Sequence, residues 1–205
     1  MSESLNKYRE LRHKCEVVAD NGGYNLANGE MNPAIVDRFV EFLSDHEAKV
    51  TWEPFANPDG RTFPPFKEAG IRLIAFSLTS GHPDIVVMDS TIYGPAEYDP
   101  TAWAVDGVLF HPPYFGSAPL SEEEGELSLV DSEEKWKEKL QTAADVAMHY
   151  CSDDAHICAV GRRYRHGGKE IKLDEWLVAV FSDMEVVEVW ESQPDIAIIL
   201  RFKKQ

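Results

Sequence analysis

Four consecutive residues, His111, Pro112, Pro113 and Tyr114, have the types and the order needed to hold a flat ring. They follow an apolar run at residues 107–110 that is typical of a short buried strand. Proline donates no backbone hydrogen bond, so two prolines end the strand and fix a rigid, extended turn beyond it. In an open α/β sheet, ligands bind beyond the carboxyl ends of the strands. The turn therefore predicts a site where the Tyr114 ring lies beside exposed carbonyl oxygens.

Residues 162–169 form a second group of functional side chains, because they hold four cations and a tyrosine. The whole chain has a net charge of −16, which opposes binding of a polyanion across a broad face. Cations gathered in one segment can still contact phosphates. The alternative is a solvated surface loop in which Gly167 and Gly168 only permit a turn. The candidate nucleic-acid-binding residues are Arg162, Arg163, Arg165 and Lys169.

Composition restricts the class of protein. The 205 residues are 43 % hydrophobic, which is enough for one domain with a substantial core. No apolar run reaches membrane-spanning length and the first residues do not form a signal peptide, so we expect a cytoplasmic protein with no membrane partner. The three cysteines, Cys15, Cys151 and Cys158, are scattered and suit free thiols in a reducing compartment. Their spacing predicts no metal site.

Helices and short apolar strands alternate along the chain, and they must position these residues. Asn32 before Pro33 predicts one helix start, and Ser132 predicts the start of a long helix that ends near residue 150. This alternation indicates a mainly parallel sheet with an antiparallel element at its end. Further helices are predicted at residues 5–19, 64–69 and 173–181, strands at 49–52, 71–76, 85–88, 108–111, 157–160, 186–190 and 196–202, and a mobile acidic loop at 120–129.

In this order of elements, the chain resembles the Rossmann-type, S-adenosylmethionine-dependent DNA methyltransferases of the amino group. The Pro-Pro-Tyr turn resembles their Asp/Asn/Ser-Pro-Pro-Tyr motif, and residues 53–62 resemble their Asp-Pro-Phe-x-Gly-x-Gly-Thr-Thr cofactor loop. The resemblance implies an α/β fold, a Rossmann-like three-layer sandwich whose mainly parallel sheet ends in an antiparallel C-terminal hairpin. Residues 1–22 would form an N-terminal helical extension and residues 23–205 a methyltransferase-like domain, without a separate target-recognition domain.

The resemblance also implies roles for single residues. Tyr114 would stack on a base extruded from the duplex, and His111 and the Pro112 carbonyl would accept hydrogen bonds from its amine. S-adenosylmethionine would bind at the loop after the first strand and at polar residues after the next two strands. The implied catalytic residues are His111, Pro112, Pro113 and Tyr114, and the implied cofactor-binding residues are Glu53, Phe55, Ala56, Asn57, Gly60, Ser77 and Asp89.

Three positions depart from the family's pattern. Asn57 replaces the first glycine of the cofactor loop, Ser77 replaces an acid that binds ribose, and His111 replaces Asp, Asn or Ser. Serine brings no charge to a ribose hydroxyl. Neutral histidine accepts one hydrogen bond, whereas protonated histidine only donates. The rate of an active enzyme is therefore expected to fall as the pH drops through the titration of His111.

These observations favour methylation of an exocyclic amine in nucleic acid, with adenine N6 in DNA ahead of RNA as the target. Cytosine N4 would give the same motifs. The alternative is a methyltransferase-like protein that no longer catalyses and acts as a binding or regulatory subunit. The loops at 93–103, 116–129 and 162–173 are too short for elaborate sequence readout, so a partner subunit is one possible source of target recognition. We also expect Phe55 and Tyr114 to open into one shared cleft.

Overall fold

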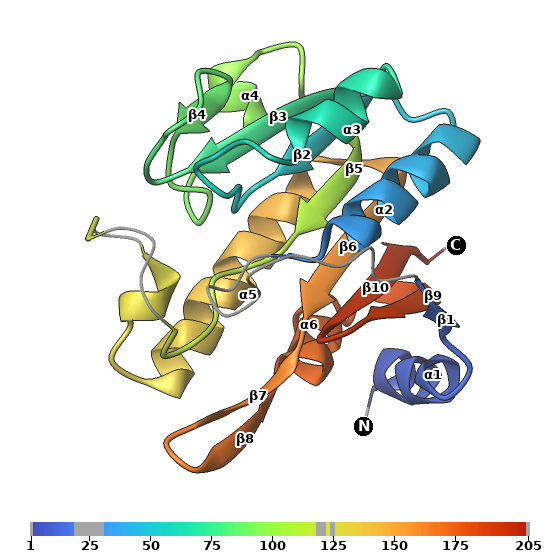
Figure 1. The fold of residues 1–205 in the computed structure, drawn as a ribbon, viewed down its shortest axis with the longest axis vertical. Coiled ribbons are helices and arrows are strands. Elements are labelled where there is room, and N and C mark those ends of the chain that lie inside the picture. Colours follow the sequence, from blue (N-terminus) through green and yellow to red (C-terminus); the bar gives the residue numbers. More distant parts are fainter. Residues whose placement is uncertain (1, 19–30, 118–121, 124–125, 204–205) are drawn as a thin grey trace.

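The computed structural model describes residues 2–18, 31–117, 122–123 and 126–203. Its strands form one eight-stranded sheet and a separate two-stranded hairpin (Figure 1). The strands of the large sheet are β1 (Glu16–Val17), β2 (Val50–Glu53), β3 (Arg72–Ser77), β4 (Ile85–Val87), β5 (Val105–Phe110), β6 (Cys151–Gly161), β9 (Met184–Ser192) and β10 (Asp195–Phe202), and the hairpin contains β7 (Arg163–His166) and β8 (Lys169–Lys172).

The order of strands in the large sheet is β1-β9-β10-β6-β5-β2-β3-β4. Strands β6, β5, β2, β3 and β4 are parallel to their neighbours in this series, and β10 is antiparallel to both β6 and β9. This confirms the expected α/β fold with a mainly parallel sheet and an antiparallel C-terminal hairpin. The chain runs outward from β2 through β3 to β4 and then returns to the other side of β2. The strand order therefore reverses between β2 and β5, where a crevice for ligands is expected.

Helices cover both faces of the sheet and complete a three-layer sandwich. One apolar core joins the second and third helices to Leu109, Cys158 and Ile199. The opposite core joins the fifth and sixth helices to Val108 and Ile157, which alternate with the first set along the strands. The helices are α1 (Glu3–Arg12), α2 (Pro33–Asp45), α3 (Phe63–Glu68), α4 (Pro95–Tyr98), α5 (Glu133–His149) and α6 (Leu173–Val180), and Leu127–Leu129 form a 3₁₀ turn.

The two predicted helix starts are confirmed. The Asn32 side chain accepts a hydrogen bond from the Ala34 N–H at 3.0 Å, and proline occupies the first turn of α2. The Ser132 hydroxyl caps α5 by accepting from the Lys135 N–H at 3.3 Å. The apolar face of α5 is fully buried, at Trp136, Leu140, Ala144 and Ala147.

The N-terminal segment is shorter as a helix than predicted and is joined to the sheet. Helix α1 ends at Arg12, and β1 then pairs in parallel with β9. The Tyr8 side chain is fully buried in the same core as α5 and α6. The described part of the extension is thus integrated with the domain, while the expected boundary at residue 22 lies outside the described residues.

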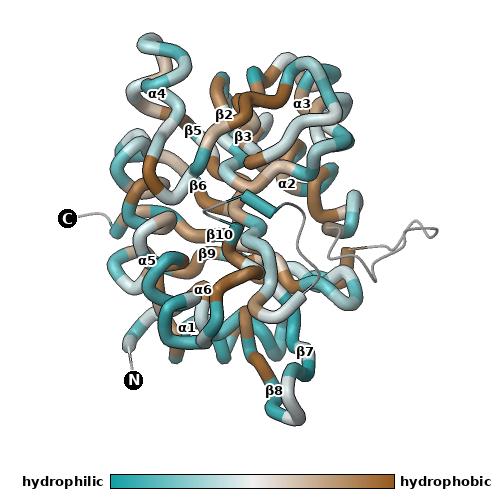
Figure 2. Tube along the Cα trace, turned by 90° about the vertical axis from the view of Figure 1, so that its left-hand side faces the viewer, coloured by the Kyte–Doolittle hydropathy of each residue, from teal (hydrophilic) through white to brown (hydrophobic). Residues whose placement is uncertain are grey.

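The region after β6 also differs from the expectation, because residues 163–172 form a hairpin where a loop was predicted. Gly167 and Gly168 have φ angles of +57° and +80°, which the tight turn requires and which glycine tolerates. The hairpin projects from the body of the domain beside α6 (Figure 1), and β7 is hydrophilic whereas the inner strands are hydrophobic (Figure 2). Within the described residues, no helix is long and apolar enough to cross a membrane.

Candidate functional site

A pocket lies at the carboxyl ends of β2, β3, β4 and β5. The lining residues lie at or just after the ends of β2, β3 and β4 and in the Pro-Pro turn that follows β5, and Glu126 and Leu127 complete the lining. This is the crevice expected where the strand order reverses. The pocket is lined by Pro54, Phe55, Ala56, Ser77, Leu78, Thr79, Met88, Asp89, Ser90, Thr91, Pro113, Glu126 and Leu127.

The charged side chains of the pocket lining are both acidic. Asp89 accepts from the Thr91 N–H at 2.9 Å and from the Thr91 hydroxyl at 2.7 Å. Glu126 is 5 % exposed and accepts from the N–H and the hydroxyl of Ser128 at 3.1 and 2.8 Å. None of the described lining residues is Lys, Arg or His. The pocket therefore favours a ligand that carries positive charge or hydrogen-bond donors.

Four of the seven cofactor candidates, Phe55, Ala56, Ser77 and Asp89, line this pocket. Phe55 packs edge-on against Phe110, at 5.2 Å between ring centroids, so its position is fixed by the core. The other three candidates, Glu53, Asn57 and Gly60, are not among the lining residues.

Glu53 lies at the end of β2 beneath the cofactor loop and is 2 % exposed. It accepts a hydrogen bond from the Thr62 hydroxyl at 2.6 Å, which ties the strand to the start of α3. Burial raises the pKa of the Glu53 carboxyl to about 7. Glu53 is therefore a buried residue beneath the loop, and its hydrogen bond links β2 to α3.

The loop itself is closed by its own contacts. Asn57 accepts from the Asp59 N–H at 3.3 Å. Gly60 has a φ of +68°, and a Cβ at this position would lie 2.5 Å from the imidazole Cγ of His82. The space that the absent Cβ leaves at Gly60 is therefore occupied by the His82 ring. This ring also stacks on Phe63, with 5.2 Å between the ring centroids.

Glu126 is the pocket residue that the sequence pattern missed most clearly. It belongs to the acidic segment at 120–129 that was expected to be a mobile loop. Residues 118–121 and 124–125 lie outside the described residues, but Glu126 and Leu127 are buried. The signal was the Leu127-Ser128-Leu129 run after the acids, which forms a 3₁₀ turn and places Leu127 in the core.

Tyr114 does not open into the pocket, so the expectation of one cleft shared with Phe55 was wrong for its side chain. Pro113 reaches the pocket, whereas Tyr114 turns toward β6 and is 6 % exposed. Its ring stacks on Tyr164 of the hairpin at 5.4 Å, and the Arg162 guanidinium lies 5.0 Å from its centroid. In this arrangement a base could stack on the Tyr114 ring only by displacing Tyr164 or Arg162 from it.

His111 is half-buried and its Nε2 lies 2.9 Å from the Tyr114 hydroxyl. Burial, and then the nearby Arg162 charge, lower the pKa of His111 to about 3. The imidazole is consequently neutral at any pH where the protein would be assayed. The expected loss of rate through the titration of His111 therefore moves to strongly acidic pH.

The two proline carbonyls of the turn differ in their availability. The Pro113 carbonyl accepts from the Trp136 indole N–H at 3.2 Å. No donor to the Pro112 carbonyl is found among the described residues. Of the two carbonyls, Pro112 is thus the one without a donor among the described residues, although the residue itself is buried.

The basic segment is largely engaged in ion pairs within the protein. Arg162 is 9 % exposed and pairs with the fully buried Asp195 at 2.8 Å, so the expectation of a solvent-exposed arginine was wrong at this position. Lys169 pairs with Glu133 at 2.5 Å. Arg165 is exposed and stands opposite Glu170 in the hairpin register.

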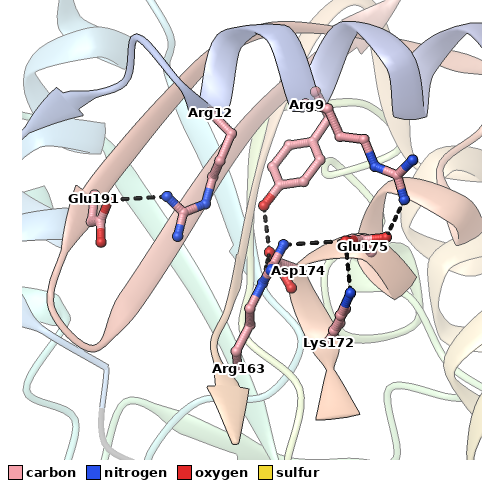
Figure 3. A network of polar contacts seen from close by, with 8 residues as sticks. Arg9, Arg12, Arg163, Lys172, Asp174, Glu175 and Glu191 are labelled. Atoms are coloured by element: carbon pink, nitrogen blue, oxygen red, sulfur yellow. Dashed lines mark hydrogen bonds and ion pairs between the residues drawn. The ribbon is translucent and has the colours of Figure 1, made fainter. Parts of the chain in front are cut away.

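Arg163 belongs to a network that joins the base of the hairpin to α1 (Figure 3). It donates to the buried Asp174 at 2.9 Å and to Glu175 at 3.2 Å. Tyr8 and Arg9 of α1 reach the same two acids, at 2.5 and 2.7 Å. The hairpin is therefore anchored at its base by charges from three elements.

Comparison with known proteins gives structural but not sequence relatives. No protein-family model matches the sequence, and no curated protein matches it. A 1,6-didemethyltoxoflavin-N1-methyltransferase of Burkholderia thailandensis, solved with 1,6-didemethyltoxoflavin and S-adenosylhomocysteine, is similar with a TM-score of 0.56 at 12 % identity, over 84 % of this chain and 80 % of that chain.

Two further structures cover most of the chain. A TehB-like SAM-dependent methyltransferase of Corynebacterium glutamicum has a TM-score of 0.52 at 14 % identity, over 97 % of this chain and 98 % of that one. A ribosomal protein L11 methylase of Lactobacillus delbrueckii subsp. bulgaricus has a TM-score of 0.54 at 9 % identity, over 89 % and 81 %. The chain thus has the Rossmann-like fold of SAM-dependent methyltransferases. Because these proteins are named for very different substrates, the fold does not choose among them.

Proposed function

We propose that the protein is an S-adenosylmethionine-dependent methyltransferase that acts on an exocyclic amine of a nucleic-acid base, with adenine N6 in DNA as the first candidate. One observation carries this proposal. Pro113 belongs both to the rigid turn after β5 and to the wall of the pocket over β2, β3 and β4. A ring held at the turn would therefore lie next to a ligand held in the pocket.

The pocket lining fits S-adenosylmethionine in its chemistry. The molecule carries a sulfonium, an ammonium, ribose hydroxyls and a flat adenine ring. Asp89 and Glu126 offer negative charge, Ser77 offers a hydroxyl, and Phe55 and Met88 offer apolar walls. When bound, the cofactor supplies an electrophilic methyl group, whose bond to sulfur breaks as the bond to nitrogen forms, leaving S-adenosylhomocysteine and one proton from the amine.

The chain's own residues would orient the amine. The Pro112 carbonyl would accept one amine hydrogen, and no described residue donates to it. His111 is neutral, so it can accept the other. Withdrawing both hydrogens toward acceptors keeps the nitrogen lone pair available for transfer.

Nucleic acid remains the proposed partner, with a smaller contact surface than the sequence indicated. Arg165 and Lys169 are exposed on the hairpin, and Arg163 is partly exposed at its base. Burial of Arg162 removes it from the phosphate-binding candidates. Few free cations on a chain of net charge −16 also support the proposal that a partner subunit contributes to target binding.

A non-catalytic binding or regulatory subunit is the second candidate, and two contacts favour it. His82 occupies the space in front of Gly60 in the cofactor loop. Tyr164 stacks on the ring that was expected to receive a base. Both contacts would need to shift in an enzyme that binds cofactor at the loop and base on Tyr114.

Calorimetric titration with S-adenosylmethionine and S-adenosylhomocysteine separates the two candidates at the first step. Saturable binding of both, followed by transfer of labelled methyl from S-adenosylmethionine to duplex DNA, is the expected result. Binding without transfer to DNA, RNA or a mixture of oligonucleotides supports the non-catalytic candidate. If neither S-adenosylmethionine nor S-adenosylhomocysteine binds, the proposal that the protein is a methyltransferase enzyme is rejected.

A further inference from the structure

Glu126 is a buried acid that lines the pocket from the segment after the Pro-Pro-Tyr turn. It is the N-cap residue of the 3₁₀ turn Leu127–Leu129. The N–H and the hydroxyl of Ser128 both donate to the same oxygen, Oε1 of Glu126, at 3.1 and 2.8 Å. Both donors are neutral, so they fix the carboxylate in the wall of the pocket without cancelling its charge.

Helix α5 places Glu126 at the same end of the pocket as the turn after β5. The 3₁₀ turn packs against α5 and is separated from it only by residues 130–132, so it lies at the start of this helix (Figure 1). Trp136, in the first turn of α5, donates its indole N–H to the Pro113 carbonyl at 3.2 Å. Leu127 belongs to the same buried core as Trp136. Glu126 and Pro113 are therefore held together by the start of α5.

Asp89, the other acid among the described lining residues, lies at the opposite end of the pocket. It follows β4, and β2 and β3 separate β4 from β5 in the sheet. Neighbouring strands are about 4.8 Å apart, so three such spacings put the end of β4 about 14 Å from the end of β5. One acid thus stands at each end of the pocket.

S-adenosylmethionine and S-adenosylhomocysteine differ in charge at one atom. The cofactor carries a positive sulfonium, whereas the product carries a neutral thioether, because the electron pair of the broken carbon–sulfur bond stays on sulfur. A methyl group delivered to a ring at the turn must lie at the Pro113 end of the pocket. The sulfonium would then lie on the side of Glu126, and the adenosine would extend toward Asp89.

We propose that Glu126 is a specificity-determining residue that pairs with the sulfonium, so that the pocket selects the charged cofactor over its neutral product. This inference rests on the proposed function, because it takes S-adenosylmethionine as the ligand. A carboxylate in a buried site attracts a nearby unit charge more strongly than it would in water, and it offers no such attraction to a thioether. Methyl transfer therefore removes the charge that Glu126 binds, and the product is released more readily than the cofactor.

The same contact opposes the chemical step, and this separates a specificity role from a catalytic one. The sulfonium loses charge on the way to the transition state, so a carboxylate beside it stabilises the bound cofactor more than the transition state. Removal of the Glu126 charge should therefore raise KM for S-adenosylmethionine without lowering kcat. A catalytic role would instead lower kcat.

Calorimetric titration with three ligands tests the proposal without any need for activity. The ligands are S-adenosylmethionine, S-adenosylhomocysteine and sinefungin, in which a carbon with an ammonium group replaces the methylated sulfur. The two charged ligands should bind at least about tenfold more tightly than S-adenosylhomocysteine. This preference should persist at about 0.5 M KCl, because salt screens the charge of the exposed surface far more than that of a buried side chain.

Glu126→Gln is the decisive variant, because it removes the charge and keeps an oxygen that can accept from Ser128. It should weaken binding of both charged ligands about tenfold and change Kd for S-adenosylhomocysteine by no more than about twofold. Glu126→Asp keeps the charge and should retain the preference. Thermal unfolding of each variant checks that the protein is folded.

Two further variants are controls for loss of one negative charge. Asp89→Asn removes it from the other end of the pocket and should change Kd for all three ligands by the same factor. Glu122→Gln removes it from an exposed position outside the pocket lining and should leave all three constants unchanged.

Equal affinities of the wild type for S-adenosylmethionine and S-adenosylhomocysteine overturn the proposal, whatever the variants do. An equal loss for all three ligands in Glu126→Gln also overturns it. A preference that Glu126→Gln abolishes, in a protein that transfers no methyl group to nucleic acid, supports the role of Glu126 and rejects the proposed enzyme. Methyl transfer without the preference rejects the role of Glu126 and keeps the enzyme, and failure of all three ligands to bind rejects both.

Discussion

The two halves of the carboxyl edge of the sheet are built differently. Over β2, β3 and β4, the pocket acids Asp89 and Glu126 hydrogen-bond to residues two positions further along the chain. Over β5, β6 and β10, Arg162 and Arg163 pair with acids that lie 33 and 11 residues away, at Asp195 and Asp174. Local turns therefore shape the first half, whereas ion pairs between residues far apart in the sequence stabilise the second.

This difference has a consequence for ligands. A ligand can enter the pocket half without breaking any of the ion pairs described above. On the hairpin half, a base near Tyr114 must compete with Tyr164 and with a buried ion pair. We therefore expect cofactor binding to be independent of the hairpin and target binding to be coupled to it. Substitutions in the two halves should separate these properties.

The largest expected effect is on the hairpin half, in Arg162→Ala. Removal of the guanidinium leaves the Asp195 carboxylate fully buried without its charged partner. Breaking one side of a buried pair typically costs about 3–5 kcal/mol in the free energy of unfolding. Urea denaturation followed by circular dichroism should show this loss.

Arg165→Ala is the matched control, because it removes the same group from an exposed position of the same hairpin. Its free energy of unfolding should change by no more than about 0.5 kcal/mol. Equal stability of the two variants would show that the Arg162–Asp195 pair does not hold the second half together.

The next effect concerns Glu53, under the pocket half, and depends on pH. Its folded-state pKa of about 7 lies above the ordinary value of 4.5. Between these values the folded protein keeps a proton that the unfolded chain has lost, so stability falls as the pH rises through this window and is constant above it. The fall amounts to about 3 kcal/mol. Glu53→Gln should abolish it.

Urea denaturation at pH 4.5 and pH 8 measures this effect. Glu53→Gln should match the wild type at the lower pH and exceed its stability at the higher pH, because the amide can still accept from the Thr62 hydroxyl. Glu134→Gln, at an exposed position of α5, is the control and should leave the pH dependence of the wild type intact. A parallel fall in wild type and Glu53→Gln would assign the dependence to another group.

Ser77→Asp is expected to strengthen cofactor binding in the pocket half. A carboxylate adds a charge-assisted hydrogen bond to a ribose hydroxyl, which is worth roughly 1.5–3 kcal/mol, or about tenfold to hundredfold in Kd. Calorimetry with S-adenosylhomocysteine measures the change. Ser77→Asn, which is polar and of similar size to Asp but uncharged, should give a much smaller gain. Weaker binding in Ser77→Asp would indicate that repulsion from Asp89 outweighs the new contact.

The sequence predicted the pocket half better than the hairpin half, for a physical reason. Strand ends, caps and the Pro-Pro-Tyr turn are local, so Phe55, Ala56, Ser77 and Asp89 could be assigned to one edge from periodicity and resemblance. Asp195, which pairs with Arg162, lies 33 residues from it in the sequence and has no motif that marks it. Contacts between distant residues leave no periodic signal.

The hairpin itself illustrates the same limit. Its cations were predicted as a phosphate-binding group because they are close in sequence. Their positions along the hairpin separate them: Arg162 precedes β7 and is buried, Arg163 at the base of the hairpin joins the α1 network, and Arg165 lies further out and is exposed. Gly167 and Gly168 correctly predicted the turn, but the sequence around them did not indicate that strands would flank it.

The smallest expected effect tests what remains of that phosphate-binding group. Arg165 is exposed at the hairpin and has no ion-pair partner among the described residues. If it contacts one phosphate, Arg165→Ala should weaken binding of duplex DNA and reduce the slope of log K against log salt by about 0.9. Fluorescence anisotropy with a labelled oligonucleotide between 50 and 200 mM KCl, a range set by the counterion-release argument, measures both quantities.

Lys7→Ala is the control for this last effect, because it removes one positive charge from an exposed position of α1 and leaves the hairpin intact. It changes the net charge by the same amount, so any general electrostatic loss will appear in both variants. A slope reduced only in Arg165→Ala places a phosphate beside the hairpin, on the half of the edge where the target is expected. Equal slopes in all three proteins would move the nucleic-acid contact to another surface or to a partner subunit, and would leave the hairpin as a structural cover over Tyr114.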